Sequence, residues 1–197
     1  MSDWNFDGVT FKHSVCLPQK TMERLNQLDS PLDAMRRLNR EYDQLPFLLH
    51  NMKAFKEIGL LEQAVVELYI MLGPSYGAQG MDAWKELFAL SERDCLRATP
   101  VQSFCPIDCE KFTIYRGCMP EKLQDISWTL SLEKAQQDVK QHFGGRAQEA
   151  RVYQVAANMD DVAFFTNARG TLEVVLHPAS PLFSRLHEEV VTISATD

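Results

Sequence analysis

Three short motifs in the second half of the chain carry side chains that could do chemistry together. They are Tyr115-Arg116-Gly117, the segment SWTLS that starts at Ser127, and Glu173 at the start of the apolar run EVVL. A guanidinium binds phosphate through paired hydrogen bonds, and a carboxylate stabilises positive charge that develops beside it. Taken alone, each residue also has a structural interpretation, as a surface ion-pair partner, a solvent-facing strand residue or the polar member of an edge strand.

The elements that must position these motifs are strands. After Pro100, short stretches rich in β-branched and aromatic residues predict strands at 112–115, 126–130, 151–155 and 172–176, and a further strand at 190–194. A helix is predicted at 132–143, with Ser131 as its N-cap and Gly144-Gly145 as its stop. The motifs therefore fall on separate strands.

The first half of the chain has a different periodicity. From 19 to 97 the apolar residues recur at helical spacing, and Ser30-Pro31 predicts a helix start. Pro46 predicts a break, Gly73-Pro74 the end of a long helical run that begins near residue 52, and a further helix is predicted at 81–96. We therefore predict an α+β protein with a helical region at 1–100 and a strand-rich region at 101–197.

The order of the three motifs resembles the arginine-serine-glutamate class of the ADP-ribosyltransferase superfamily, which includes toxin-type enzymes of bacteria and phages. The segments DVAFF at 161–165 and RGTLE at 169–173 are similar to the approach to the catalytic glutamate in that family. The resemblance covers about 111–176. It implies a split β-sandwich in the second region and transfer of ADP-ribose from NAD, as substrate, to a macromolecular acceptor.

The resemblance also implies a role for each motif residue. Cleavage of the bond between nicotinamide and ribose leaves positive charge on the ribose, so a carboxylate must lie beside it. Arg116 is implied to brace the phosphates, backbone groups of Gly117 to hold the nicotinamide amide, and Ser127 to bind the ribose and orient the glutamate. Glu173 is implied to stabilise the transition state. Arg116, Ser127 and Glu173 are the candidate catalytic residues, and no metal is expected.

Three further residues are implied to lie around the NAD site. Thr129 and Trp128 would shape the strand around Ser127. Phe164 would pack in the core, stack on nicotinamide or line the acceptor site. The candidate NAD-binding residues are thus Arg116, Gly117, Ser127, Thr129 and Phe164.

The acceptor is suggested by Thr171. In family members that modify arginine, an acidic or amide residue lies two positions before the catalytic glutamate, and a threonine cannot serve there as a carboxylate base. We therefore expect a nucleic acid, with RNA favoured, another protein side chain or a small molecule as acceptor. A local basic face for RNA could come from Lys134, Lys140, Arg146 and Arg151.

Bulk properties limit the alternatives. The 197-residue chain has a net charge of −7, which disfavours nonspecific binding to nucleic acid. Its start does not resemble a signal peptide and no apolar run could span a bilayer, so we expect a cytoplasmic protein without membrane contact. Four of the five cysteines lie between Cys95 and Cys118, but their spacing is poor for zinc.

Two other functions stay open from the sequence. The chain could be an NAD glycohydrolase, in which water replaces the acceptor, or a non-catalytic interaction module on the same fold. If it is a toxin, an antitoxin protein is an expected partner. The role of the first region, as a cap, docking surface or support, is left open.

Overall fold

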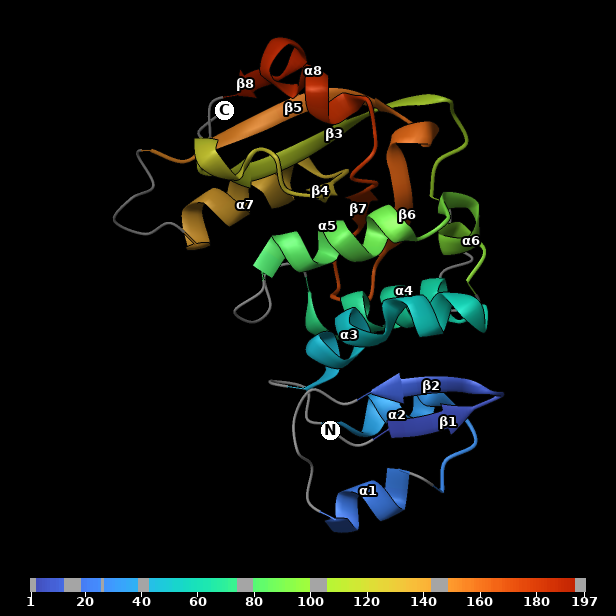
Figure 1. Ribbon diagram of the computed structural model, residues 1–197. Coiled ribbons are helices and arrows are strands. Elements are labelled where there is room, and N and C mark those ends of the chain that lie inside the picture. The colour runs from blue at the N-terminus through green and yellow to red at the C-terminus, as the bar shows by residue number, and fades with distance from the viewer. Residues whose placement is uncertain are drawn as a thin grey trace. The chain divides into compact units, whose positions relative to one another are not determined.

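The computed structural model describes residues 3–12, 19–25, 27–38, 43–73, 80–99, 106–142 and 149–193. The chain divides into two compact units, Met1–Val101 and Gln102–Asp197 (Figure 1). Helices and strands occur in both units, so the α+β class predicted from the sequence is confirmed. No helix in the described ranges is long and apolar enough to cross a membrane.

The first unit combines helices with a β-hairpin that the sequence reading missed. Asp7 and Gly8 both have positive φ, 49° and 82°, as a two-residue hairpin turn requires. The prediction of a helical region at 1–100 therefore omitted this hairpin. The elements of this unit are β1 (Asp3–Phe6), β2 (Val9–Lys12), α1 (Gln19–Leu25), α2 (Pro31–Arg37), α3 (Gln44–Glu57), α4 (Leu61–Leu72), α5 (Gly80–Leu90) and α6 (Arg93–Arg97).

The hairpin is fixed to α3 by one amide side chain and by aromatic packing. Asn51 accepts a hydrogen bond from the Lys12 backbone N–H and donates one to its carbonyl oxygen, both at 2.6 Å. The rings of Phe11 and Phe55 meet edge to face with centroids 5.1 Å apart. The buried Asn51 amide thus bonds to the backbone of β2 as a neighbouring strand would, and it links the hairpin to α3.

Two predicted helices are interrupted in the structure. The run expected from about 52 to 73 is divided between α3 and α4 at Gly59, whose φ is 71°. The Leu60 N–H donates to the Phe55 carbonyl at 2.9 Å, which is the hydrogen bond over five residues that closes a glycine-terminated helix end. The helix expected at 81–96 is divided between α5 and α6 at Ser91, whose hydroxyl donates to the Leu87 carbonyl at 2.9 Å.

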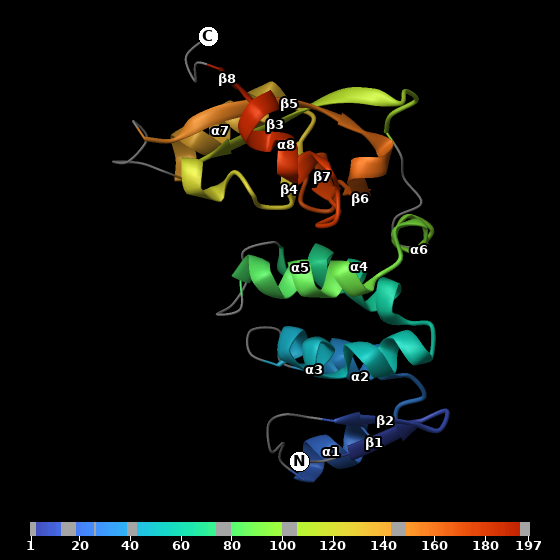
Figure 2. The same ribbon diagram turned by 45° about the horizontal axis from the view of Figure 1, so that its top comes forward.

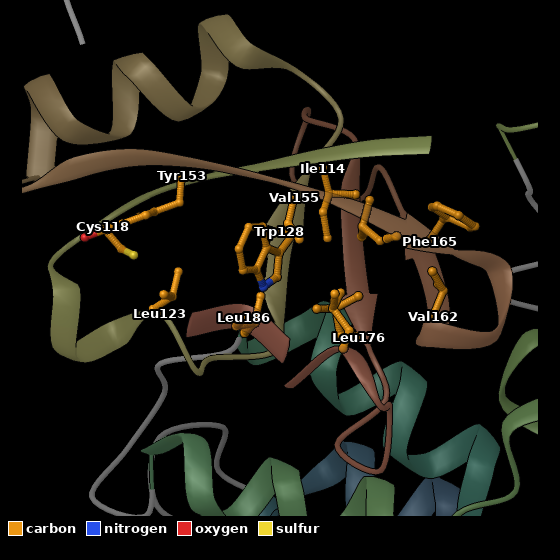
Figure 3. Close-up of a cluster of buried hydrophobic side chains, with 13 residues drawn as sticks. Ile114, Cys118, Leu123, Trp128, Tyr153, Val155, Val162, Phe165, Leu176 and Leu186 are labelled. Atoms are coloured by element: carbon orange, nitrogen blue, oxygen red, sulfur yellow. The ribbon is translucent and has the colours of Figure 1, made fainter. Parts of the chain in front are cut away.

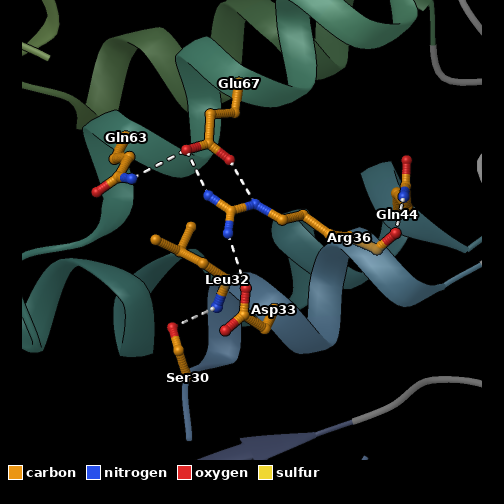
Figure 4. Close-up of polar contacts among 7 residues, drawn as sticks. All are labelled: Ser30, Leu32, Asp33, Arg36, Gln44, Gln63 and Glu67. Carbon is orange, nitrogen blue, oxygen red and sulfur yellow. Dashed lines mark hydrogen bonds and ion pairs between the residues drawn. The ribbon is translucent and has the colours of Figure 1, made fainter. Parts of the chain in front are cut away.

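The start of α2 agrees with its prediction, and the helix is linked to α4 by an ion pair. Ser30 caps α2 by accepting a hydrogen bond from the Leu32 N–H at 3.2 Å. Arg36 donates from Nε and Nη2 to the two carboxylate oxygens of Glu67 and from Nη1 to Asp33 (Figure 4). This fork raises the pKa of Arg36 and gives the residue a structural role.

The second unit is built on one six-stranded antiparallel sheet with the order β6-β7-β4-β3-β5-β8. The strands predicted from the sequence are present, whereas β6 and α8 were not predicted. The elements are β3 (Lys111–Cys118), η2 (Pro120–Lys122), β4 (Ser127–Thr129), α7 (Leu132–His142), β5 (Arg151–Asn158), η4 (Met159–Asp161), β6 (Val162–Thr166), β7 (Glu173–Leu176), α8 (Leu182–Glu189) and β8 (Val191–Ile193).

Helices α7 and α8 lie on opposite sides of strands β3 and β5 (Figure 1). Neighbouring residues of β5 show why, because Val152 packs with α7 and Tyr153 packs in the cluster that contains α8. That larger cluster surrounds Trp128 (Figure 3). The view turned by 45° shows α8 crossing in front of the sheet (Figure 2).

The start of α7 agrees with the sequence prediction. The Ser131 hydroxyl accepts a hydrogen bond from the Lys134 N–H at 3.1 Å, and the Ser131 carbonyl accepts one from Ala135 at 3.2 Å. The predicted stop at Gly144-Gly145 lies outside the described residues.

Candidate active site

Ser127 and Glu173 lie next to each other on paired strands. Strands β4 and β7 are antiparallel, with Ser127 opposite Val175 and Thr129 opposite Glu173. Residues two apart on a strand share a face, so Ser127 and Glu173 are diagonal neighbours on the same face. The Ser127 hydroxyl donates a hydrogen bond to Glu173 Oε1 at 2.5 Å. The two motifs thus meet at one carboxylate.

Arg116 on β3 contacts the backbone of β4 and not the Glu173 carboxylate. Tyr115 pairs with Thr129, which places Tyr115 in the cross-strand row of Glu173 and directs Arg116 to the other face. The Arg116 guanidinium donates from Nη1 to the Ser127 carbonyl and pairs through Nη2 with Asp125 at 2.8 Å. The structure therefore brings Arg116 to Ser127 but does not direct its guanidinium at Glu173.

Asp125 is a site residue that the sequence reading missed. Its carboxylate holds Arg116, and its backbone carbonyl accepts a hydrogen bond from Trp128 Nε1 at 3.1 Å. Both partners of this ion pair are mostly buried, with 16% and 15% of their side chains exposed. The sequence signal for Asp125 was an acidic residue two positions before Ser127, the first residue of β4.

Gly117 makes a close approach, and its neighbour in the structure is a helix. A Cβ placed on Gly117 would lie 2.0 Å from the Ala135 carbonyl oxygen and 3.1 Å from a Val139 methyl group. Only a residue without a side chain lets α7 pack this closely on β3. The implied contact with nicotinamide stays a prediction, but helix packing already accounts for the glycine.

Thr129 and Phe164 lie in the interior. The Thr129 hydroxyl donates to the Leu172 carbonyl at 3.0 Å and accepts from the Ser131 N–H at 3.1 Å, so it links β4 to the residue before β7. Phe164 is 1% exposed, which fits the packing role that the sequence allowed for it. Neither contact involves the Glu173 carboxylate.

Arg169 is the second site residue that the sequence reading did not assign. Its Nη2 forms an ion pair with Glu173 Oε2, so both carboxylate oxygens have a donor. Arg169 lies in the turn between β6 and β7, which Thr166 and Glu173 close as a register pair. Gly170 has a φ of 75°, and this turn brings the Arg169 side chain back to Glu173 at the start of β7.

The thiol of Cys118, on the same strand as Arg116, is poorly suited to act as a nucleophile. Burial raises the pKa of Cys118, although the positive charge of Arg116 opposes the shift. A buried thiol with a raised pKa has little thiolate near neutral pH. Among the described residues no group of three or more His, Cys, Asp or Glu side chains could hold a metal, and Cys105 lies outside them.

The residues proposed for a basic face have different surroundings. Lys134 forms an ion pair with Asp138 on α7, and Arg151 Nη1 donates to the carbonyl of the preceding Ala150 at 2.9 Å. Lys140 is exposed, and Arg146 lies outside the described residues. Within the described residues of this basic face, the charge of Lys134 is therefore already paired with a carboxylate.

Comparisons with known proteins do not assign the chain to a family. No family model matches the sequence, and neither a curated protein nor a solved structure matches the chain. Functional inference therefore rests on the site itself.

Proposed function

We propose that this protein is an NAD-dependent ADP-ribosyltransferase whose catalytic carboxylate is Glu173. The observation that carries the proposal is the hydrogen bond from the Ser127 hydroxyl to Glu173 across two paired strands. The resemblance of the sequence motifs to the arginine-serine-glutamate class supports the same assignment. The split β-sandwich that the resemblance implies stays a prediction, since β3 and β4, with the register pair Tyr115 and Thr129, belong to one six-stranded sheet.

The proposed reaction breaks the bond between the nicotinamide nitrogen and C1 of the ribose. The electron pair of that bond leaves with nicotinamide, and positive charge develops on the ribose. Glu173, oriented by Ser127, stabilises this charge in a mostly buried position where electrostatic effects are strong. A nucleophilic atom of the acceptor then bonds to C1, and its proton passes to solvent.

Arg116 has a positioning role in this proposal. Its contacts with Asp125 and the Ser127 carbonyl fix the strand that carries the serine hydroxyl. The planar guanidinium suits this task because it makes both contacts from one rigid group. The role is different from the direct phosphate contact that the motif resemblance implies.

RNA or a protein side chain other than arginine is the proposed acceptor. Thr171 is partly exposed near the end of the turn before β7 and carries no carboxylate that could activate a guanidinium. The protein should therefore not modify arginine efficiently. If the acceptor is water, the same groups would make the protein an NAD glycohydrolase.

The experiment that tests the function uses NAD labelled in its adenylate portion, with cell lysate as the source of acceptors. Purified protein and its Glu173→Gln variant are incubated in parallel, and the labelled macromolecules are digested separately with nuclease and with protease. Label that depends on Glu173 and is released by nuclease supports RNA transfer. Free labelled ADP-ribose without labelled macromolecule would indicate hydrolysis. No consumption of NAD by the folded protein would contradict the proposal.

A further inference from the structure

We propose that Arg169 is a latch on Glu173 that the diphosphate of a bound dinucleotide displaces. In the structure the guanidinium pairs with Glu173 Oε2, while Ser127 donates to Oε1. This inference rests on the proposed function, because it assigns the second oxygen of the same carboxylate. On substrate binding Arg169 moves from Glu173 to the diphosphate, and the freed oxygen accepts a hydrogen bond from a ribose hydroxyl.

The two partners of this ion pair differ in their exposure. The Glu173 side chain is 10% exposed and the Arg169 side chain is 35% exposed. The carboxylate is therefore held in the protein, whereas the cation approaches it from a more open position. Solvent screens the exposed side of this ion pair. A diphosphate carries more negative charge than one carboxylate, so it can replace Glu173 as the partner of the guanidinium, while a ribose hydroxyl replaces the guanidinium as the donor to Glu173.

The turn that carries Arg169 is suited to a change of partner. The Gly170 N–H donates to the Asn167 carbonyl at 2.9 Å and the Ala168 N–H to the Thr166 hydroxyl at 3.2 Å, so the turn has its own hydrogen bonds. These bonds do not depend on the guanidinium. Displacement of the guanidinium from Glu173 therefore leaves these hydrogen bonds of the turn in place.

Arg116 cannot easily supply the cation for the diphosphate. It is committed to Asp125 and to the Ser127 carbonyl, and it lies on the other face of the sheet from Glu173. Arg169 is already at the carboxylate, and its guanidinium can bind phosphate oxygens in pairs. The geometry thus assigns the phosphate contact to Arg169.

Binding of ADP tests the latch without any reaction, since ADP has the diphosphate but lacks the nicotinamide ribose. Calorimetric titration should show that Arg169→Ala and Arg169→Gln each weaken ADP binding by about tenfold or more, the cost of a hydrogen bond to a charged group. The matched control is Arg185→Ala, which removes the same charge from α8, a helix whose Leu182 and Leu186 pack with Trp128 on the face of the sheet opposite to Glu173. The control should leave the affinity unchanged. Equal affinities for all four folded proteins would overturn the proposal.

A double-mutant cycle separates displacement from general electrostatics. Glu173→Gln removes the competing partner, so it should tighten ADP binding by up to about fivefold when Arg169 is present. In the Arg169→Ala background the gain should largely disappear. An equal gain in both backgrounds would mean that Glu173 only repels the phosphates, and the latch would be wrong.

The outcomes distinguish this inference from the proposed function. If the protein cleaves NAD but Arg169→Ala leaves ADP affinity unchanged, the latch alone is wrong. If ADP binding follows the expected cycle but NAD is not cleaved, the enzymatic proposal is wrong and Arg169 remains a phosphate-binding residue. Absence of both ADP binding and NAD cleavage would overturn both.

Discussion

The Ser127 hydroxyl donates a 2.5 Å hydrogen bond to Glu173 although 46 positions separate the two residues in the sequence. The pairing of β4 with β7 brings them together, and their shared face directs both side chains to one place. A carboxylate held by a hydroxyl has a defined orientation. This relationship leads to predictions on both catalysis and stability.

Ser127→Ala should lower the turnover number for NAD cleavage by about tenfold to a hundredfold, because one hydrogen bond to the carboxylate is lost. The fold should persist, since the hydroxyl is replaced by a smaller group. Steady-state release of nicotinamide measures the effect. Ser184→Ala on α8 is the control, because Ser184 bonds only locally to the Pro181 carbonyl at 2.7 Å in the described contacts. Similar turnover in both variants would remove Ser127 from the catalytic arrangement.

Arg116→Lys should destabilise the protein by about 2 kcal/mol, because an ammonium cannot replace both guanidinium contacts. Asp125→Asn should have an effect of similar size. Denaturant unfolding of both variants and of the double variant measures the coupling. We expect the double variant to lose less than the sum of the single losses. Additive losses would show that Arg116 and Asp125 act independently.

Gly117→Ala should lower stability by about 3 kcal/mol or more, because the new methyl group would collide with the Ala135 carbonyl oxygen. Thermal unfolding measures the change. Lys111→Ala at the exposed start of the same strand is the control, and surface changes of this kind usually stay within about 0.5 kcal/mol. If Gly117→Ala unfolds at the temperature of the native protein, α7 does not approach β3 as described.

Cys118 should react slowly with alkylating reagents while the protein is folded. Burial raises its pKa, so at mildly alkaline pH it carries less thiolate than an exposed cysteine. The pKa of the Cys118 thiol is higher in the folded state than in the unfolded state. The folded protein therefore loses stability as the pH rises from the unfolded pKa through the folded pKa, because burial disfavours the thiolate. Peptide mapping after brief alkylation should find the exposed Cys95 and Cys109 modified before Cys118. Equal modification of all three would contradict the buried environment.

Much of the second unit could be predicted because its strands have clear composition. The segments around Arg116, Ser127 and Glu173 are short and rich in β-branched or aromatic residues, and Ser131 is a good helix N-cap. Strand β6 was missed because the run at 162–166 was interpreted only as the approach to Glu173. The hairpin turn at Asp7-Gly8 had a usable signal that was overlooked.

The contacts within the site were harder to predict because they depend on register and turn geometry. The register that pairs Tyr115 with Thr129 cannot be predicted from the sequence. This register decides that Arg116 lies on the face of the sheet opposite to Glu173. The same applies to Arg169, which returns to Glu173 through a turn with positive φ at Gly170. For Gly117 the close approach was expected, but its neighbour was the backbone of α7.

The most direct test of the account is release of nicotinamide from NAD by the purified protein and by its Glu173→Gln variant. The substitution keeps the shape and removes the charge, so the rate should fall by about a hundredfold to a thousandfold in a protein that still folds. Glu121→Gln, which removes the same charge at an exposed position in η2, should retain the native rate. A folded Glu173→Gln variant that releases nicotinamide as fast as the native protein would contradict the central claim.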